Sequence, residues 1–260
     1  MAENYLGNPR LKSVGQNVEW TEESVNEYQL CWKNPDYFIE NYVKIVHVDR
    51  GLVPFDMYPY QKKMIHTFQE DRFVICKMPR QTGKSTTIIS FLLHYILFNQ
   101  SVNCAILANK LSTARELLGR LQLAYENLPK WMQQGVVVWN KGDIALENGS
   151  KILAAATSSS AVRGSSFNII FLDEFAHVPN NIADQFFTSV YPTISSGETT
   201  KVFIVSTPLG LNMFYKMWID AEEGRSNYTP IDVDWREVPG RDDKWRDETI
   251  KNTSQQQFTQ

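Results

Sequence analysis

Apolar and polar positions follow a helical pattern in the first part of the chain, after an irregular start. Residues 1–20 mix Asn, Gly, Pro and Lys without periodicity, which predicts a flexible arm. Thr21 and the two glutamates after it suit a helix N-terminus. The apolar residues that follow recur on one helix face: Val25, Tyr28 and Trp32. With a second helix expected from Pro35, residues 21–70 are predicted to form a helical lead-in.

Beyond residue 70, short apolar runs alternate with amphipathic helical stretches. The predicted strands are Phe73–Lys77, Asn103–Ala108, Asn168–Leu172 and Lys201–Ser206. The predicted helices between them are Gly83–Phe98, Leu111–Leu128 and Ile182–Val190. This alternation predicts an α/β fold in which a mainly parallel sheet is covered by helices. We expect this core to occupy residues 71–222.

One interruption predicts a β-hairpin insertion. Residues 143–147 and 151–156 flank Asn148-Gly149, a strong signal for a tight hairpin turn, and we expect this hairpin to lie off the parallel sheet. A further helix is expected to about Glu222. Residues 223–260 form a charged, Trp-containing stretch that we interpret as a lid or linker. Because the chain stops at QQQFTQ inside an apparent helix, we expect a fragment of a longer protein.

Composition and charge narrow the class of protein. The 260 residues are ample for a buried core, and the formal net charge of -3 supplies no bulk positive field for a polyanion. The longest mainly apolar run falls well short of the roughly 20 residues that cross a bilayer, so no membrane span is expected. No apolar signal segment opens the chain. Three widely spaced cysteines favour a reducing, cytosolic compartment.

The strongest chemical signal is Met78-Pro79-Arg80-Gln81-Thr82-Gly83-Lys84-Ser85, between the first core strand and a long helix. A phosphate-binding loop needs inward N–H groups, a helix N-terminus, a lysine for the β- and γ-phosphates and a hydroxyl for Mg²⁺. Gly83, Lys84 and Ser85 supply these parts. Met78 replaces the usual first glycine, so the motif is deviant. The alternative is an ordinary helix start with a solvated lysine.

The apolar run NIIFLDE ends in two adjacent carboxylates. In a phosphate-loop enzyme the first acid, Asp173, holds Mg²⁺, and the second, Glu174, can orient and deprotonate the attacking water. Taken alone, such a pair is more often a helix cap. The conjunction with Lys84 favours the catalytic interpretation.

Two arginines could supply transition-state charge. Arg80 lies inside the phosphate loop and is interpreted as acting on the nucleotide of its own chain. Arg163, in AVRG after the predicted hairpin, could act on a neighbouring chain, and a solvated loop arginine remains the alternative.

Other polar residues carry weaker signals. Ser206 and Thr207 end a predicted strand and could sense the γ-phosphate, although a plain turn is the simpler interpretation. Gln61 offers a donor and an acceptor that match adenine, but as a lone residue it reads as surface. The four histidines, His47, His66, His94 and His177, show no metal-ligand spacing and are interpreted as structural.

Taken together, the sequence resembles the large terminase subunit of tailed bacteriophages, the ATPase of a DNA-packaging motor, most closely the type found in myoviruses. The resemblance covers about residues 20–260. The motifs that carry it are YQKKMI, PRQTGKST, WNKG, ENGSKI, AVRGSSF, IIFLDEFAHVPN and VSTPLGLNMFY. Several spaced motifs in order, with an arginine inside a deviant phosphate loop, make it specific.

The resemblance implies an additional-strand, RecA-like P-loop NTPase fold that uses ATP and Mg²⁺. It assigns adenine contact to Gln61 and coupling to Ser206 and Thr207. It assigns metal binding to Ser85 and Asp173, and catalysis to Glu174 with Arg80 and Arg163, the latter donated to a neighbour. The phosphate contacts it implies are Arg80, Gln81, Thr82, Gly83, Lys84, Ser85 and Thr86.

The resemblance also implies partners and a location. These are double-stranded DNA, the portal protein of the procapsid, a small terminase subunit and further copies of the chain in a ring, in the host cytoplasm and on the portal vertex. The family's nuclease domain is not expected within these residues. Two alternatives remain open: a helicase-like DNA translocase, which portal binding would discriminate, and a nucleotide-gated assembly protein with little turnover, which would have little need of Glu174.

Overall fold

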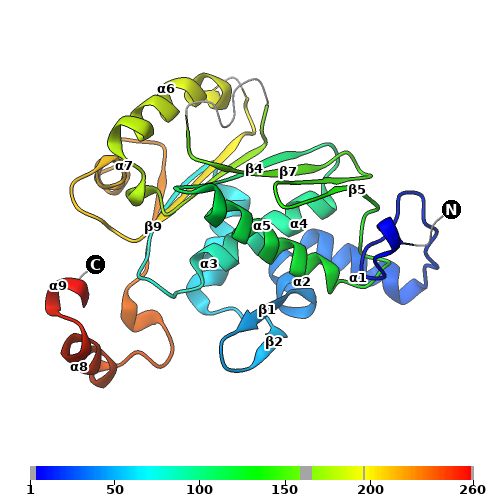
Figure 1. Ribbon diagram of the computed structural model, residues 1–260, viewed down its shortest axis with the longest axis horizontal. Helices are drawn as coiled ribbons and strands as arrows, with labels where there is room; N and C mark the ends of the chain where they lie inside the picture. The colour runs from blue at the N-terminus through cyan, green and yellow to red at the C-terminus, as the bar shows by residue number, and fades with distance from the viewer. Residues whose placement is uncertain (1–3, 159–165, 196, 259–260) are drawn as a thin grey trace.

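A computed structural model describes residues 4–158, 166–195 and 197–258 (Figure 1). Its centre is an eight-stranded sheet with the order β10-β3-β9-β8-β4-β7-β6-β5. The strands from β10 to β7 run parallel, and β6 and β5 continue the sheet in antiparallel pairs. The bounds are β3 Phe73–Lys77, β4 Asn103–Ala108, β5 Val136–Trp139, β6 Asp143–Leu146, β7 Lys151–Ala156, β8 Ile169–Asp173, β9 Lys201–Ser206 and β10 Thr229–Asp232.

Helices cover both faces of this sheet (Figure 1). One face is covered by α3 Pro59–Glu70, α4 Lys84–Phe98 and α5 Leu111–Glu126, and the other by α6 Asn180–Ser195 and α7 Met213–Glu222. The C-terminal α8 Asp243–Asn252 and α9 Gln255–Phe258 lie beyond β10. Within the described ranges, no helix combines the length and apolar character needed to traverse a bilayer.

The predicted core strands agree closely with the structure. The bounds of β3, β4 and β9 are those expected from the apolar runs, and β8 is shifted by one residue. Every residue of β8 is buried. Strands buried on both faces have continuous apolar sequences, which explains why these strands could be predicted from the sequence. The α/β fold class is confirmed.

The predicted hairpin forms, but the expectation that it lies off the parallel sheet is wrong. Gly149 takes a φ of +81° in the turn between β6 and β7. Strand β7 pairs in parallel with β4 along its whole length, from Asn103 opposite Lys151 to Ala108 opposite Ala156. Without β7, β4 would present an edge of unpaired N–H and C=O groups. The hairpin therefore extends the sheet.

The lead-in contains more than helices. Besides α1 Glu22–Lys33 and α2 Pro35–Tyr42, it holds a two-stranded antiparallel sheet of β1 Lys44–His47 and β2 Gly51–Pro54. These four-residue strands have few buried side chains, so their apolar pattern is weak. Strand β10 was also missed. It is equally short, and it includes Pro230 at the edge of the main sheet, where a missing N–H is tolerated.

The described part of the N-terminal arm is attached to the body of the protein. Leu11 is buried. The side chain of Gln133 accepts a hydrogen bond from Lys12 N at 3.0 Å and donates one to Arg10 O at 2.9 Å. Val136 N donates to Lys12 O at 2.9 Å. These contacts are made to residues more than 100 positions away, so no local pattern could indicate them.

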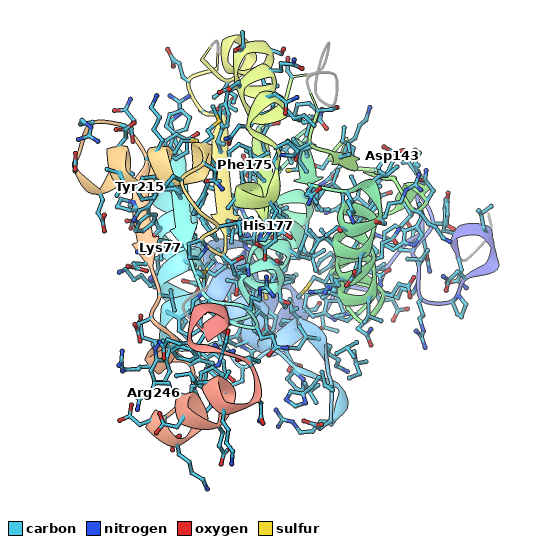
Figure 2. The ribbon with its side chains drawn as sticks, turned by 60° about the vertical axis from the view of Figure 1, so that its left-hand side comes forward. Lys77, Asp143, Phe175, His177, Tyr215 and Arg246 are labelled. Atoms are coloured by element: carbon cyan, nitrogen blue, oxygen red, sulfur yellow. The ribbon has the colours of Figure 1, made fainter. Side chains whose placement is uncertain are left out.

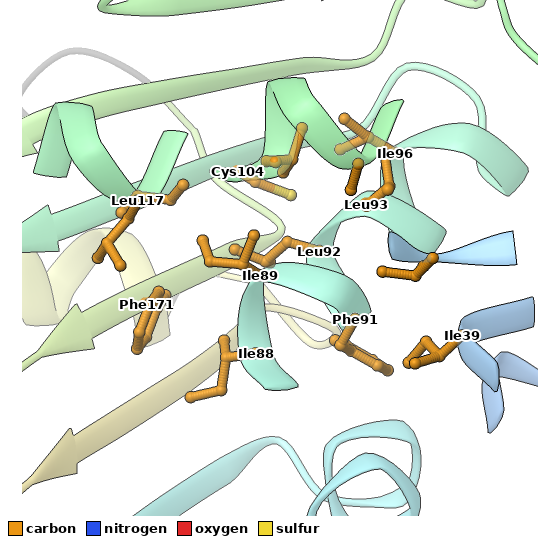
Figure 3. Packing of buried hydrophobic residues seen from close by; sticks show 14 of the residues in the cluster. Ile39, Ile88, Ile89, Phe91, Leu92, Leu93, Ile96, Cys104, Leu117 and Phe171 are labelled. Carbon is orange, nitrogen blue, oxygen red and sulfur yellow. The ribbon is translucent and has the colours of Figure 1, made fainter. Parts of the chain in front are cut away.

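Helix α4 is the centre of the larger apolar core (Figure 3). Almost every residue from Thr87 to Leu97 is buried, because the helix lies between the sheet, α5 and the lead-in helices. Figure 3 shows Leu92 and Ile88 facing the strands and Phe91 facing Ile39 of α2. This packing fixes the position of the helix that begins directly after the phosphate loop.

His94 lies within this core on α4. Its Nε2 atom donates to Cys31 O of α1 at 2.8 Å, and the rings of Phe38 and Phe98 pack against the imidazole. Burial lowers the pKa of His94 to about 4, against a usual 6.5. The folded protein therefore resists protonation of a side chain that protonates readily when the chain is unfolded.

We expect His94 to make the protein sensitive to acid. Because its folded-state pKa is lowered, the stability it supports is present above pH 6.5 and is lost as the pH falls towards 4, by at most about 3 kcal/mol. His94→Gln keeps a donor for Cys31 O but does not titrate. Denaturant unfolding at pH 7 and pH 4.5 should show a smaller acid loss in this variant than in wild type. His47→Gln, at the end of β1 and away from the apolar core, is the control. Equal acid loss in wild type and His94→Gln would contradict the assignment.

Candidate active site

The phosphate loop joins the end of β3 to the start of α4. Gly83 takes a φ of +73°, which favours glycine, and a Cβ atom there would also lie 2.5 Å from Gln61 Nε2. Gln81 also has a left-handed backbone, with a φ of +57°. No side chain caps the N-terminus of α4, which leaves its first N–H groups directed at the loop. The loop therefore has the backbone arrangement of an anion site.

The two acids at the end of β8, Asp173 and the following Glu174, lie directly opposite this loop. Lys84 Nζ is 2.7 Å from Glu174 Oε1, and Ser85 Oγ donates to Asp173 Oδ1 at 2.7 Å. The carboxyl ends of β3, β9 and β8 lie at one edge because these strands are parallel and in register. Residues about 90 positions apart in the sequence thus meet at this edge.

Glu174 is held by several donors. Its Oε2 atom accepts from Thr207 N at 3.2 Å and from Thr207 Oγ1 at 3.1 Å, and Ser206 Oγ lies 3.3 Å away. Burial by itself raises the pKa of Glu174, but the charge of Lys84 and the donors of Thr207 outweigh it, so the pKa lies below its usual value. Glu174 is an ionised carboxylate with a strained backbone, since its φ is +48°.

Asp173 has the opposite electrostatic balance. It is 4% exposed, and burial together with the neighbouring charge of Glu174 raises its pKa to about 6, although the Ser85 hydroxyl acts in the other direction. A carboxylate and a hydroxyl side by side are oxygen ligands of the kind that Mg²⁺ takes when phosphates and waters complete its shell. The residues present therefore fit the metal that the sequence implied.

A cavity of about 400 Å³ opens at this edge of the sheet. Its walls include Arg80, Lys84, Lys110, Glu174, His177 and Thr207. Arg80 and Gln81 are exposed at its rim. Two cavity residues were not expected from the sequence. Lys110 follows β4. His177 ends the short 3-10 helix after β8 (Figure 2). The cavity combines cations with one carboxylate, which suits a polyphosphate and the water that attacks it.

Gln61 does lie beside the loop, where both parts of its amide are engaged. Its Oε1 atom accepts from Tyr58 N at 2.8 Å, and its Nε2 atom donates to Thr82 O at 3.1 Å. Tyr60 OH donates to the same carbonyl at 2.8 Å. Gln61 is 2% exposed and Thr82 is likewise buried, whereas Thr86 is partly exposed on the first turn of α4. Gln61 thus holds the backbone of the loop in place through Thr82 O.

A second support for the loop comes from the far end of the chain. Arg241 Nη2 donates to Arg80 O at 2.9 Å and to Gln81 O at 3.1 Å, and its guanidinium lies over the ring of Trp245. A neighbouring cavity of about 600 Å³ lies between the loop and this C-terminal segment. No sequence signal indicated Arg241, which is about 160 positions from its partners. Arg163 lies outside the described residues.

Comparisons with known proteins agree with this geometry. Large terminases are among the solved structures with the same fold. The large terminase of bacteriophage HK97 is 17% identical with a TM-score of 0.70, and the alignment covers 88% of this chain and 53% of that one. The large terminase ATPase domain of Thermus phage P74-26 is 19% identical with a TM-score of 0.65, with coverage of 79% and 92%. The chain therefore spans about half the length of the HK97 protein.

A third similar structure is a large terminase from a thermophilic bacteriophage in complex with ADP, 14% identical with a TM-score of 0.56, with coverage of 75% of this chain and 50% of that one. These structural similarities show a common fold. The family is shown by a different comparison: the family model described as "Terminase large subunit, T4likevirus-type, N-terminal" matches residues 75–260, from within β3 onwards. The chain thus belongs to the T4likevirus-type family of terminase large subunits.

Proposed function

We propose that this chain binds ATP with Mg²⁺, hydrolyses it to ADP and phosphate, and uses the reaction to move double-stranded DNA into a viral procapsid. One observation carries the proposal: Lys84 and Ser85 of the phosphate loop meet Glu174 and Asp173, at the end of β8, at 2.7 Å. The family membership supports the link to DNA packaging. A site with a placed, ionised carboxylate has little use in a protein that only binds nucleotide.

The loop residues divide the work of holding the phosphates. The N–H groups from Gln81 to Thr86 and the positive end of α4 would bind phosphate oxygens, with Lys84 on the β- and γ-phosphates. Ser85 and Asp173 would hold Mg²⁺, which when bound neutralises phosphate charge. Arg80, which lines the same cavity, would reach the γ-phosphate of its own nucleotide.

The ion pair between Lys84 and Glu174 couples phosphate binding to activation of the base, because both depend on Lys84. Lys84 cannot keep its full contact with Glu174 while it binds phosphate oxygens. Phosphates therefore draw Lys84 away, and Glu174 keeps the two donors of Thr207 that fix its orientation. The freed carboxylate can then accept the proton of a water whose oxygen attacks the γ-phosphorus, and ADP leaves.

The base-binding part of the site remains a proposal. Adenine contact by Gln61 would use the second hydrogen of Nε2 and the second lone pair of Oε1, because Thr82 O and Tyr58 N occupy only one of each. Such a contact would connect recognition of the base to the position of the loop carbonyl. The proposed coupling role of Ser206 and Thr207 has a similar basis, because both contact Glu174 and precede the exposed turn that leads to α7.

The partners proposed are double-stranded DNA, the portal protein, a small terminase subunit and further copies of this chain in a ring, in the host cytoplasm and on the portal vertex. The net charge of -3 leaves only local lysine and arginine clusters for DNA phosphates. We therefore expect one isolated copy to bind duplex DNA weakly. A ring would add such contacts together.

Lys84→Ala should weaken ATP binding and lower turnover together. Loss of charge-assisted contacts to the phosphates is expected to weaken ATP binding roughly 10- to 100-fold. Isothermal titration calorimetry measures the affinity, and phosphate release measures turnover. Lys141→Ala, in an exposed turn, is the matched control. Unchanged affinity in a folded Lys84→Ala protein would exclude Lys84 from the nucleotide site.

Glu174→Gln should separate binding from hydrolysis. Turnover should fall by roughly 10² or more, the scale of a lost general base. ATP affinity should be retained or rise, because an amide no longer competes with phosphates for Lys84. Glu116→Gln, which changes an exposed carboxylate paired with Arg120, is the control. If Glu174→Gln hydrolyses ATP at the wild-type rate, another residue is the base.

Arg163 is proposed to act on the nucleotide of a neighbouring copy. Arginine fingers are worth roughly 10³ to 10⁵ in rate, so isolated copies should turn over slowly and specific activity should rise with protein concentration. Mixing Arg163→Ala with Glu174→Gln should recover some activity, since one variant retains the base and the other donates the arginine. Failure of every mixture under conditions where copies associate would end the trans assignment.

A further inference from the structure

His177 belongs to the catalytic cavity and is not a remote structural histidine. It ends the short 3-10 helix η2, Phe175–His177, directly after the two acids (Figure 2). Its Nε2 atom is 3.1 Å from Thr207 Oγ1 and 3.6 Å from Glu174 Oε2. About a quarter of its side chain is exposed, and it lines the 400 Å³ cavity beside Lys84. His94, by contrast, is buried in the apolar core.

The proton positions of this cluster follow from its acceptors. An ionised Glu174 can only accept, so the single hydrogen of the Thr207 hydroxyl points at Oε2. The hydroxyl then has only lone pairs to offer His177, and Nε2 must carry a hydrogen. Ser206 cannot replace Thr207, because its hydroxyl is closer to Thr207 O, at 2.8 Å, than to Glu174, at 3.3 Å. Thr207 is therefore the principal neutral partner of Glu174.

We propose that His177 is a positioning residue for the base: its Nε2–H fixes the rotation of the Thr207 hydroxyl, which in turn holds the carboxylate of Glu174. The proposal rests on the proposed function, ATP hydrolysis with Glu174 as base. Its effect is greatest once phosphates draw Lys84 away, because Thr207 then supplies the contacts that orient Glu174. Without His177 the rotation of the hydroxyl is fixed only by its bond to Glu174 itself.

The same histidine could be thought merely to fasten two loops. The loops after β8 and β9 are, however, already joined by Ala176 N to Ser206 Oγ at 3.0 Å and by Asn212 Nδ2 to Ala176 O at 2.8 Å. The bond of Asn212 does not continue to Glu174, and that of Ala176 reaches it only through the Ser206 hydroxyl, 3.3 Å from Oε2. The contact between His177 and Thr207 continues to the carboxylate through the shorter bond of Thr207 Oγ1, at 3.1 Å. If His177 only joins the loops, its loss should lower stability. If it positions the base, its loss should lower kcat.

Three variants separate these roles. His177→Phe retains a ring but has no donor, and kcat should fall about tenfold while KM for ATP is unchanged. His177→Gln retains an N–H donor and should recover most of kcat. Asn212→Ser keeps a hydroxyl to cap α7 and removes the two bonds that Nδ2 donates, to Ala176 O and to Leu209 O, so it should lower the melting temperature and leave kcat unchanged. Wild-type kcat in His177→Phe would overturn the proposal.

A double-mutant cycle tests the route through Thr207. His177→Phe should have no added effect in a Thr207→Val background, because the hydroxyl that it orients is gone. Additive losses in kcat would mean that His177 acts independently, which overturns the proposal.

The histidine tautomer gives a readout that does not need turnover. Nitrogen-15 NMR of wild-type protein should show the hydrogen of His177 on Nε2, and Thr207→Val should shift that resonance. An Nδ1–H tautomer would overturn the positioning role even if the chain hydrolyses ATP. Absence of turnover in wild type, with the expected tautomer, would instead count against ATP hydrolysis and leave the hydrogen-bond chain established.

Discussion

The ion pair between Lys84 and Glu174 is the contact around which the active site is organised. Both side chains are largely withdrawn from water, and each would be costly to bury alone. The pair can form because β3, β9 and β8 are parallel and end at one edge, so a loop and an acidic turn from distant segments converge there. The strained backbone of Glu174 and the left-handed Gly83 are local adjustments that bring the two charges together.

Much of the surrounding structure fixes the position of the phosphate loop and of Lys84 at its end. Helix α4 is buried on nearly all sides, which fixes the position of the loop's last residues. Gln61 and Tyr60 bind Thr82 O from one side, and Arg241 binds the carbonyls of Arg80 and Gln81 from another. A loop with a methionine in place of its first glycine is thus supported by residues outside the motif.

The sequence predicted the parts of this arrangement that depend on local pattern. The apolar strands β3, β4 and β9, the loop, and the acids at the end of β8 could all be located, because buried strands and phosphate loops have short-range signatures. Their convergence followed from the rule that parallel strands share a carboxyl edge. The pairing of β7 with β4 could not be predicted in this way, because a hairpin signal indicates the turn and not the neighbouring strand with which the hairpin pairs.

Residues whose roles arise only from long-range contact were not predictable. His177 differs from His94 in one local signal, its place three residues after Glu174 in IIFLDEFAHVPN, but its contact with Thr207 depends on the pairing of β8 with β9. Lys110 lines the cavity and Arg241 contacts the loop, and both come from segments without any motif.

The contact of Arg241 with the loop has a consequence for the energetics of the whole chain. Its bonds to Arg80 O and Gln81 O join the C-terminal segment to the backbone that would surround the phosphates. If the two loop conformations, with and without nucleotide, present these carbonyls differently, then the docking of the segment and the affinity for nucleotide are thermodynamically linked. Such linkage is reciprocal: a partner that pulls on α8 changes nucleotide affinity by the same factor by which nucleotide changes the hold on that partner.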